Sequence, residues 1–413
     1  MREQDSDVII VGGGAGGAEL AVRLARAGCA RVRLIDQAAT HVWKPRLHEL
    51  AAGAARGELG EIRYRDLAER WGFVFEQAAL GAIDPQEKTI TLAAGDAQQQ
   101  RAYRVLVLAL GGTTPDLGVD GVTEHAFMLD RAPDAEALYK RFTQALDEAA
   151  VQTPPRPARV VIVGTGLTGV ELASYLASHA HVVARADTTH AQTLAIHLVE
   201  ASATFMPGFD DAPTRRGVRT RLEALGVTVH TGQTIARVEA DGVVTEQGTR
   251  LDSDMTVWAT GRVGPPLAVH DERLPANDKQ QWRVGKTLQS VAHADIFALG
   301  DCCALEDSPW PATAQVASQQ AEHLSAQIMA YLDGDTPAAF VFRDKGVLMS
   351  FGAGGDLGLV RGPRGDTLRI HGHVSHAAYR ALERQHQWVL LGTRATVEGA
   401  AGDFFDTLRA RYV

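Results

Sequence analysis

The chain has 413 residues, 45% of them hydrophobic and 22% charged, which is an ordinary globular composition with room for two or three domains. Its formal net charge of −9 argues against a nucleic-acid partner, whose phosphates require a basic face. No run of 18 apolar residues occurs, so we expect any membrane contact to be peripheral. The three cysteines, Cys29, Cys302 and Cys303, lack a C-x-x-C spacing and fit a reducing, cytosolic compartment.

The first predicted unit is a strand, a tight turn and a helix. Residues 8–11 are apolar, and the motif Gly12-x-Gly14-x-x-Gly17 follows them. In such a motif one glycine permits the turn, the second lets the backbone approach a pyrophosphate, and the third lets the helix pack closely on the strand. Asp36 ends the next predicted strand, where a carboxylate can accept hydrogen bonds from ribose hydroxyls. The unit therefore predicts a dinucleotide site.

Two later strands complete this domain. Residues 105–109 form an apolar strand that ends at Ala109, shortly before Gly111. Residues 296–299 form another, which ends in a glycine and Asp301. A Gly-Asp pair is by itself usually a turn, but a carboxylate at a strand end could bind the ribityl hydroxyls of FAD. Beside an N-terminal dinucleotide motif, the flavin interpretation is favoured.

The same pattern occurs a second time. The apolar run at residues 160–163 precedes Gly164-x-Gly166-x-x-Gly169, and a helix is predicted over residues 170–178. One such unit is common in proteins. Two of them in one chain imply two dinucleotide-binding domains.

The strand after the second motif is predicted over residues 194–199 and ends in Glu200, later than the usual spacing of about 20 residues. A polar insertion over residues 178–192 accounts for the excess. A carboxylate at Glu200 would accept a hydrogen bond from a 2′-hydroxyl and repel a 2′-phosphate, so NADH is expected rather than NADPH. Arg185 in the insertion could, however, bind a 2′-phosphate. A further strand ending at Gly261 closes this domain.

The predicted fold is α/β, with two Rossmann-like dinucleotide-binding domains and a smaller C-terminal α+β domain. After a helix over residues 312–332, strands are expected near 340–350, 357–360 and 367–374, with helices beyond. His371 and His373 would share a strand face, but they lack enough further ligands, and no metal is expected. The predicted division is 1–120 and 263–334 for the FAD domain, 121–262 for the NADH domain, and 335–413 for the C-terminal domain.

Three segments resemble the type II NADH:quinone oxidoreductases, a family of single-subunit flavoenzymes. Residues 312–321 (ATAQVASQQA) resemble the family's A-Q-x-A-x-Q-Q quinone-site motif. Residues 40–47 (THVWKPRL) resemble its H-x-[FW]-x-P loop near the flavin, and residues 164–173 (GTGLTGVELA) its NADH motif. The resemblance covers almost the whole chain. It implies transfer of hydride from NADH to FAD, and of two electrons from there to a membrane quinone, without proton pumping.

The resemblance and the motifs together assign candidate site residues. Those expected at FAD are Gly12, Gly14, Gly17, Asp36, Lys44, Ala109, Gly111, Asp301 and Gln315. Those expected at NADH are Gly164, Gly166, Gly169, Glu171, Glu200 and Gly261. Those expected at the quinone are Gln315, Gln319 and Lys345, and the catalytic candidates are Glu171, Gln315 and Gln319.

Several of these residues have plain structural alternatives. Gln315 and Gln319 lie four residues apart, so they share a helix face, and spacing alone favours two ordinary polar positions. Glu171 could fix the nicotinamide or simply complement the helix dipole. Lys345 could stabilise a quinol oxyanion or be a solvated turn lysine.

The resemblance also implies peripheral attachment to the cytoplasmic face of the inner (plasma) membrane, and it allows a homodimer. Apolar anchors for this attachment are expected at residues 387–391 and 404–408, against the alternative of an ordinary packing or dimer helix. Two functional alternatives stay open: a soluble NADH-dependent reductase of a ferredoxin or rubredoxin, and an NADH-sensing flavoprotein with poor turnover. A sulfide:quinone reductase or a disulfide reductase would need a redox cysteine pair, which the three cysteines do not supply.

Overall fold

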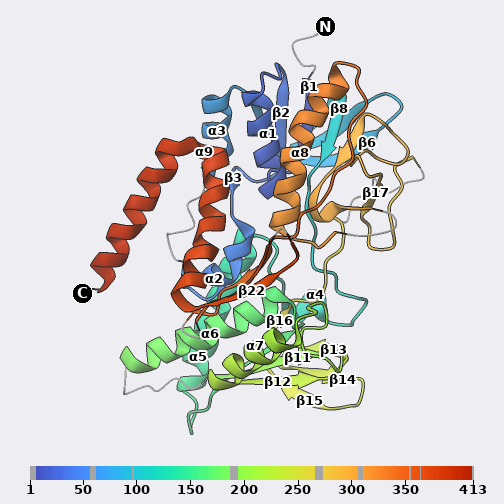
Figure 1. Ribbon diagram of the computed structural model, residues 1–413. Helices are drawn as coiled ribbons and strands as arrows, with labels where there is room; N and C mark the ends of the chain where they lie inside the picture. The colour runs from blue at the N-terminus through green and yellow to red at the C-terminus, as the bar shows by residue number, and fades with distance from the viewer. Residues whose placement is uncertain are drawn as a thin grey trace.

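Two α/β units are stacked along the length of the molecule, and the C-terminal elements pack against both (Figure 1). The computed structural model describes residues 6–55, 62–94, 97–186, 194–265, 273–305, 310–352, 355–362 and 364–411. The side chains of residues 6, 94, 97, 180–186, 394, 395 and 397–411 are not among those described.

The first unit is built on a seven-stranded sheet with the order β5-β2-β1-β8-β7-β6, in which β18 also pairs with β8. Strands β5, β2, β1, β8 and β18 are parallel, whereas β7 and β6 form an antiparallel extension. The strands are β1 (Ser6–Val11), β2 (Val32–Asp36), β5 (Val74–Gln77), β6 (Ala79–Asp84), β7 (Thr89–Ala94), β8 (Ala97–Leu108) and β18 (Ile296–Ala298). The helices of this unit are α1 (Ala15–Arg26), α3 (Tyr64–Trp71) and α8 (Ala314–Leu332).

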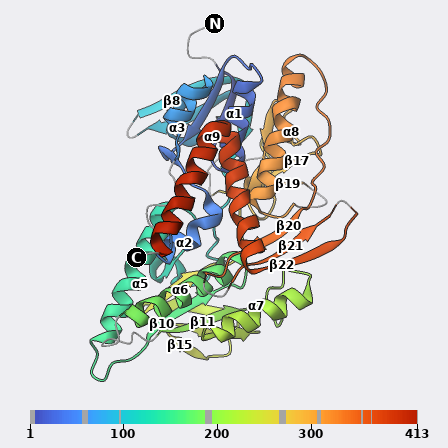
Figure 2. The same ribbon diagram turned by 60° about the vertical axis from the view of Figure 1, so that its left-hand side comes forward.

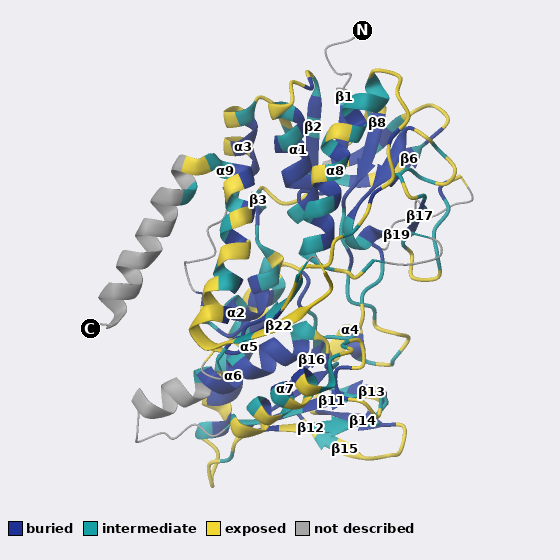
Figure 3. Ribbon diagram, in the orientation of Figure 1, coloured by how far each residue is buried: buried dark blue, intermediate teal, exposed yellow. Residues whose placement is uncertain are grey.

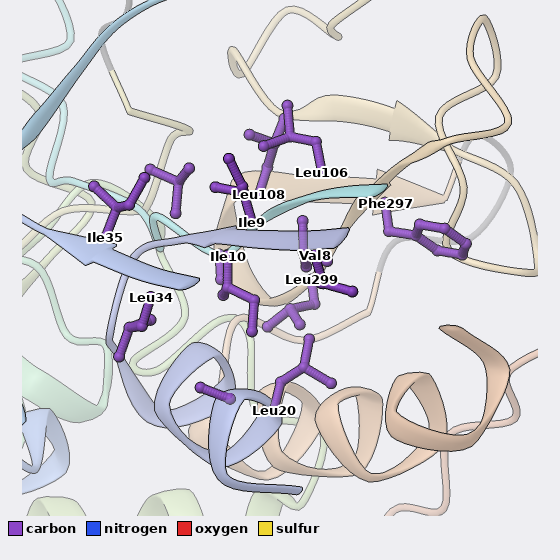
Figure 4. Packing of buried hydrophobic residues seen from close by; sticks show 14 of the residues in the cluster. Val8, Ile9, Ile10, Leu20, Leu34, Ile35, Leu106, Leu108, Phe297 and Leu299 are labelled. Carbon is purple, nitrogen blue, oxygen red and sulfur yellow. The ribbon is translucent and has the colours of Figure 1, made fainter. Parts of the chain in front are cut away.

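The centre of this unit is the predicted strand at residues 8–11, which is almost completely buried. Figure 4 shows its side chains packed between neighbouring strands and the helices, with Leu20 of α1 below and Leu106 and Leu108 of β8 beside it. A parallel strand covered on both faces requires a continuous apolar run rather than alternation. The packing therefore explains why the glycine turn after β1 has a fixed position.

The second unit has a five-stranded, wholly parallel sheet with the order β12-β11-β10-β16-β9. Its strands are β9 (Ala126–Phe127), β10 (Ala158–Val163), β11 (Leu194–Glu200), β12 (Val227–Thr231) and β16 (Met255–Trp258). Its helices are α4 (Val122–His125), α5 (Ala132–Ala150), α6 (Leu167–Ala186) and α7 (Ala212–Ala224). Helix α6 continues eight residues past the predicted end at Ser178, so part of the expected insertion is helix. Residues 187–193 and the Arg185 side chain lie outside the described part.

Short elements complete the two units and the connections between them. They are β3 (Thr40–His41), β4 (Ile62–Arg63), β13 (Ile235–Glu239), β14 (Gly242–Thr245), β15 (Arg250–Asp252), β17 (Trp282–Val284), β19 (Cys303–Leu305), α2 (Leu47–Ala51) and the 3-10 turns Lys44–Arg46 and Gly300–Cys302. The turn at Lys44–Arg46 and α2 lie between the two units (Figure 1).

The C-terminal part is a three-stranded antiparallel sheet followed by α9, and it packs beside α1 and α8 (Figure 2). Its strands are β20 (Gly346–Met349), β21 (Leu357–Arg361) and β22 (Thr367–His371). Helix α9 (Gly372–Arg411) consists of two helical stretches joined at Gly392, whose φ of 73° is not helical. Because β22 ends at His371, His373 is helical, and the predicted shared strand face of these two histidines is wrong.

Burial follows the layers, since the central strands of both sheets are dark blue in Figure 3, whereas α9 carries many exposed positions. Within the described ranges, no helix combines the length and hydropathy needed to cross a bilayer.

Candidate active site

The first glycine turn has the geometry that a dinucleotide requires. Gly12 has a φ of +104°, and a Cβ there would lie 2.3 Å from the carbonyl oxygen of Ala109. A Cβ at Gly17 would lie 1.8 Å from the carbonyl oxygen of Gly12. At Gly14, in contrast, a Cβ would meet no protein atom within 4 Å. Packing within the chain thus explains the first and third glycines, and the middle one leaves backbone open to a ligand.

The second turn repeats this geometry. Gly164 has a φ of +109°, and its Cβ would lie 2.4 Å from the carbonyl oxygen of Ala259. A Cβ at Gly169 would lie 2.1 Å from the carbonyl oxygen of Gly164, whereas one at Gly166 would meet nothing within 4 Å. Both turns therefore fit a pyrophosphate at the start of a helix.

A carboxylate stands beside each turn. The Gly13 amide donates to Asp36 Oδ2 at 2.6 Å, and burial raises the pKa of Asp36. In the second unit the Thr165 amide donates to Glu200 Oε2 at 3.2 Å, and the Thr165 hydroxyl donates to the same oxygen. Glu200 therefore occupies the position that corresponds to Asp36, although its sequence spacing is longer. Acids at these positions fit the ribose hydroxyls of the two dinucleotides.

A cluster of charges joins the two units at the ends of their strands. Arg262 Nη1 donates to Asp130 Oδ1 at 2.9 Å, and its Nε lies 3.9 Å from Asp301 Oδ2. Burial raises the pKa of Asp301, and the charges of Arg262 and Lys44 oppose this shift. Burial and the neighbouring Arg262 lower the pKa of Lys44, while Asp130, Asp301 and Asp36 act in the opposite direction. Lys44 still exposes surface, which is typical of a side chain that lines a binding site.

Two loops meet beside this cluster. Gly111 has a φ of +71°, and a Cβ there would lie 3.8 Å from Lys44 Nζ. At Gly112 a Cβ would lie 2.7 Å from the carbonyl oxygen of Val263, so only glycine allows the loops after β8 and β16 to approach. Gly261, with a φ of +55°, turns the second loop. The sequence motifs indicate Gly111, Gly261, Lys44 and Asp301 as candidate site residues, whereas no motif indicates Arg262 and Asp130.

The two glutamines of α8 hold the segment that precedes β20. Gln315 Nε2 donates to the Gly346 carbonyl at 3.0 Å, and its Oε1 accepts from the Lys345 amide at 2.8 Å. Gln319 makes the same pair of bonds with the backbone of Arg343, at 2.9 and 3.0 Å. Both amides thus have a structural role, and they share a helix face as predicted. The side chain of Lys345 is exposed at the same segment.

Gln320 supports the candidate site, although the sequence alone does not assign it there. Its side chain is completely buried, and its Oε1 accepts from the Gly300 amide at 2.7 Å. It therefore fixes the turn that carries Asp301. The only signal in the sequence was its place in the A-Q-x-A-x-Q-Q segment, directly after Gln319.

Glu171 lies near the start of α6, just after its first turn, and it faces the C-terminal sheet and α2. Its Oε1 accepts from the Ser350 amide at 2.9 Å, and its Oε2 lies 3.6 Å from His48 Nδ1. Burial raises the pKa of Glu171 well above its usual value. Burial and the charge of Arg46 lower the pKa of His48 to about 3. The pair is therefore a buried acid beside a neutral imidazole at the junction of three segments.

The three cysteines are free and buried. Burial raises the pKa of Cys302 to about 12 and that of Cys303 well above its usual value. Redox cysteines act as thiolates, which these environments disfavour. The geometry therefore argues against a cysteine-based mechanism.

The fold and the two turns define a class of protein. Residues 6–321 match the family model described as pyridine nucleotide-disulphide oxidoreductase. Among solved structures, the chain is similar to NDH2 from Plasmodium falciparum in complex with NADH, with a TM-score of 0.84, 17% identity and 98% of each chain covered. It is also similar to the sulfide:quinone oxidoreductase of Aquifex aeolicus, with a TM-score of 0.77, 18% identity and coverage of 94% of this chain and 92% of the other.

Curated relatives narrow this class. The chain is 30% identical to the type II NADH:quinone oxidoreductase of Haemophilus influenzae, over 94% of each chain. It is 26% identical to that of Staphylococcus epidermidis, over 88% of this chain and 91% of the relative. The chain belongs to the type II NADH:quinone oxidoreductase family. The predicted family, α/β fold class, enzyme class and cofactors FAD and NADH are thereby confirmed.

Proposed function

We propose that the protein oxidises NADH through bound FAD and passes two electrons to a quinone. The observation that carries this proposal is the pair of matching glycine turns, each with its carboxylate, in two units that meet at the cluster of Lys44, Asp301 and Arg262. Bound there, FAD supplies the chemistry, because its flavin accepts hydride and gives up electrons. The chain's own residues hold and orient both dinucleotides.

In this proposal the first turn holds FAD and the second holds NADH. Gly12, Gly14, Gly17 and Asp36 would bind the adenine half of FAD, with Ala109 and Gly111 on the adjacent loop. Lys44 and Asp301 would bind its flavin half. Gly164, Gly166, Gly169 and Glu200 would bind NADH, with Gly261 on the loop after β16.

The same proposal gives the domain division. Strands β8 and β18 pair with each other although the second unit lies between them in sequence, which supports a FAD domain of two parts, 1–120 and 263–334. Residues 121–262 would form the NADH domain and 335–413 the quinone and membrane side.

Quinone would bind where α8 meets the segment before β20. Gln315 and Gln319 shape this place by holding the backbone of residues 343–346, and Lys345 projects from it.

Glu171, a buried carboxyl whose pKa is raised by burial, would act beside the nicotinamide as a hydrogen-bonding group.

Gln319→Ala tests the quinone assignment. Its amide makes two backbone bonds to Arg343, so truncation should displace this segment and raise the quinone KM about tenfold, for a loss on the order of 1.4 kcal/mol. The NADH KM should change less than twofold. Steady-state kinetics with each substrate varied in turn measures both constants.

The matched control for Gln319 is Gln327→Ala, two turns further along α8. The Oε1 of Gln327 also accepts from a backbone amide, that of Ala338 at 2.6 Å, but it does not hold residues 343–346. Its truncation removes a bond of the same kind from the same helix, and it should change neither KM. Equal changes in both KM values for Gln319→Ala would contradict the assignment.

We further propose that the C-terminal part meets a membrane surface peripherally. Large apolar side chains are exposed there on the segment before β20 and over β21, β22 and α9, namely Val341, Val360, Leu368, Val374, Leu382 and Trp388. Arginines are interspersed with them at Arg361, Arg369, Arg380 and Arg384. Apolar side chains among cations fit an anionic lipid interface. The predicted anchor at residues 404–408 lies outside the described side chains. The cytoplasmic face of the inner membrane, and a homodimer, are proposed from the family resemblance.

Leu368→Ser combined with Trp388→Ser should weaken vesicle binding at least tenfold, because each of these side chains is about half exposed or more, at 64% and 48%. Cosedimentation with vesicles of anionic lipid measures this binding. Leu117→Ser combined with Val151→Ser removes two exposed apolar side chains elsewhere and should leave binding unchanged. An equal loss of vesicle binding in both double variants would contradict the proposed membrane-binding surface.

A further inference from the structure

A row of buried ionisable side chains connects the C-terminal helix with the first glycine turn. His386 of α9 is 3% exposed, and its Nδ1 lies 2.7 Å from Oε1 of Glu19, on α1. Its Nε2 lies 2.8 Å from Nε2 of His41, at the end of β3. The Nδ1 of His41 in turn lies 2.9 Å from the carbonyl oxygen of Gly13. All three side chains are buried, so this row is closed to bulk water.

Counting hydrogens along this row fixes its protonation. Each of the three contacts has hydrogen-bond length and needs one hydrogen. The Gly13 carbonyl can only accept, so His41 must carry its hydrogen on Nδ1. A neutral imidazole has a single N–H, so the Nε2 of His41 then accepts, and His386 must donate from its own Nε2. The contact between Glu19 and His386 needs a third hydrogen. A carboxylate with two neutral imidazoles supplies only two, so the row holds one additional proton.

The surroundings of Glu19 decide where this proton resides. The Ser318 hydroxyl lies 2.9 Å from both carboxylate oxygens, and Arg23 Nη2 donates to Oε2 at 3.3 Å. Two donors, one of them a cation, stabilise an ionised carboxylate. The hydrogen between Glu19 and His386 therefore belongs to His386. The ring of His386 also stacks on that of Trp43, with centroids 4.4 Å apart, and an indole face favours a cation.

The state of His41 agrees with this assignment. Burial and the neighbouring His386 lower the pKa of His41 to about 3, so His41 is the neutral member of the pair. The Tyr64 hydroxyl donates to the same Gly13 carbonyl at 2.6 Å, which agrees with the role of this oxygen as an acceptor. The other ionisable groups around the row are Arg23 on α1, Lys44 after β3, and Glu383 one turn earlier on α9, which pairs with Arg46.

We propose that Glu19, His386 and His41 form a buried proton-binding site, in which His386 is an imidazolium that fastens α9 to the first dinucleotide turn. The bound proton connects α1, α8, β3 and α9, since Ser318 on α8 also bonds Glu19. It orients His41 toward the carbonyl of Gly13, whose amide binds Asp36. His386 is thus a positioning residue for the turn. This inference does not depend on the proposed quinone chemistry.

Nitrogen NMR of the full-length protein labelled with ¹⁵N-histidine tests this assignment at pH 7.5. A scalar coupling between two Nε2 atoms identifies His386 and His41 without any variant, because the other pair of bonded histidines in the described part of the chain, His197 and His230, joins an Nδ1 to an Nε2. We expect both nitrogens of His386 to be protonated, and one nitrogen of His41 to be bare. The internal control is His376, on the same helix, whose Nδ1 lies 2.7 Å from Asp356 Oδ2, so it pairs with a carboxylate and should show no coupling to a second histidine nitrogen. A bare nitrogen on both His386 and His41 at pH 7.5 would overturn the proposal.

A second measurement uses linkage and the variant His386→Gln, which cannot hold the extra proton. Folding that takes up one proton lowers the folding equilibrium constant up to tenfold for each unit of rising pH. Between pH 7 and 8.5 the wild-type constant should therefore fall more steeply than that of His386→Gln. His376→Gln should follow the wild type. Equal slopes for the wild type and His386→Gln would count against a bound proton, and the NMR result on the wild type stands even where the variant does not fold.

Discussion

Gly17→Ala is expected to abolish flavin retention and to destabilise the protein by about 3 kcal/mol, the upper end of the usual cost of overpacking. The reason is steric, because the new Cβ would lie 1.8 Å from the carbonyl oxygen of Gly12 and 3.1 Å from the Cβ of Ala109. Backbone cannot swing aside as a flexible side chain can, so α1 must move away from β1. Flavin absorbance after purification and the midpoint of denaturant unfolding measure the two effects.

Gly14→Ala separates cofactor contact from packing. A Cβ at Gly14 would meet no protein atom within 4 Å. The free energy of unfolding of the protein stripped of flavin should therefore stay within about 0.5 kcal/mol of the wild-type value. Flavin content should nevertheless fall, because the middle glycine is where backbone approaches the pyrophosphate. A Gly17→Ala protein with wild-type stability and full flavin content would show that the turn does not work as described.

Arg46→Met should destabilise the protein by about 3–5 kcal/mol, because it would remove the cation that pairs with two buried carboxylates. Glu383 would keep longer contacts, to Arg380 at 3.6 Å and to Gln387 Nε2 at 3.5 Å. Arg46 is 2% exposed, and its guanidinium lies 2.6 Å from Glu49 Oε2 and 3.1 Å from Glu383 Oε2. Glu383 lies on α9, so this ion pair also joins the C-terminal helix to the loop that carries Lys44. The loss of stability should appear as a lower free energy of unfolding, measured by denaturant unfolding monitored by tryptophan fluorescence.

The matched control for Arg46 is Arg63→Met. Arg63 pairs with Asp66 at 3.0 Å, but its side chain is 72% exposed, so its loss should cost less than about 1 kcal/mol. Similar costs for both variants would mean that burial does not set the strength of the Arg46 pair. Restoration of stability by adding Glu383→Gln to Arg46→Met would support the explanation by unpaired charge.

The elements that we propose to bind the dinucleotides were predictable because local sequence determines them. An apolar run followed by three spaced glycines encodes strand, turn and helix, and the structure shows a steric reason for Gly12 and Gly17 that the motif already contained. Asp36 and Glu200 were found from their positions at strand ends. The longer spacing before Glu200 did not prevent its correct placement at the end of β11, because the register of a strand with its neighbour determines which residue reaches the turn.

The remaining parts depend on contacts between distant segments, which no local pattern encodes. Arg262 meets Asp130 and Asp301 only because two sheets bring their loops together. His386 and Glu19 are 367 residues apart in sequence, and their contact is set by the packing of α9 on α1. The error at His373 had a similar cause, because Gly372, with a φ of +60°, ends β22 and begins α9 where alternation of histidines had suggested a strand.

The most direct test of the proposed function is an anaerobic stopped-flow measurement in two steps on the purified flavoprotein. Mixing with NADH should bleach the flavin absorbance, and a second mixing with a soluble quinone should restore it at a rate that matches steady-state turnover. A ferredoxin or rubredoxin in place of the quinone should leave the flavin reduced. Flavin that NADH reduces but quinone fails to reoxidise would contradict the account.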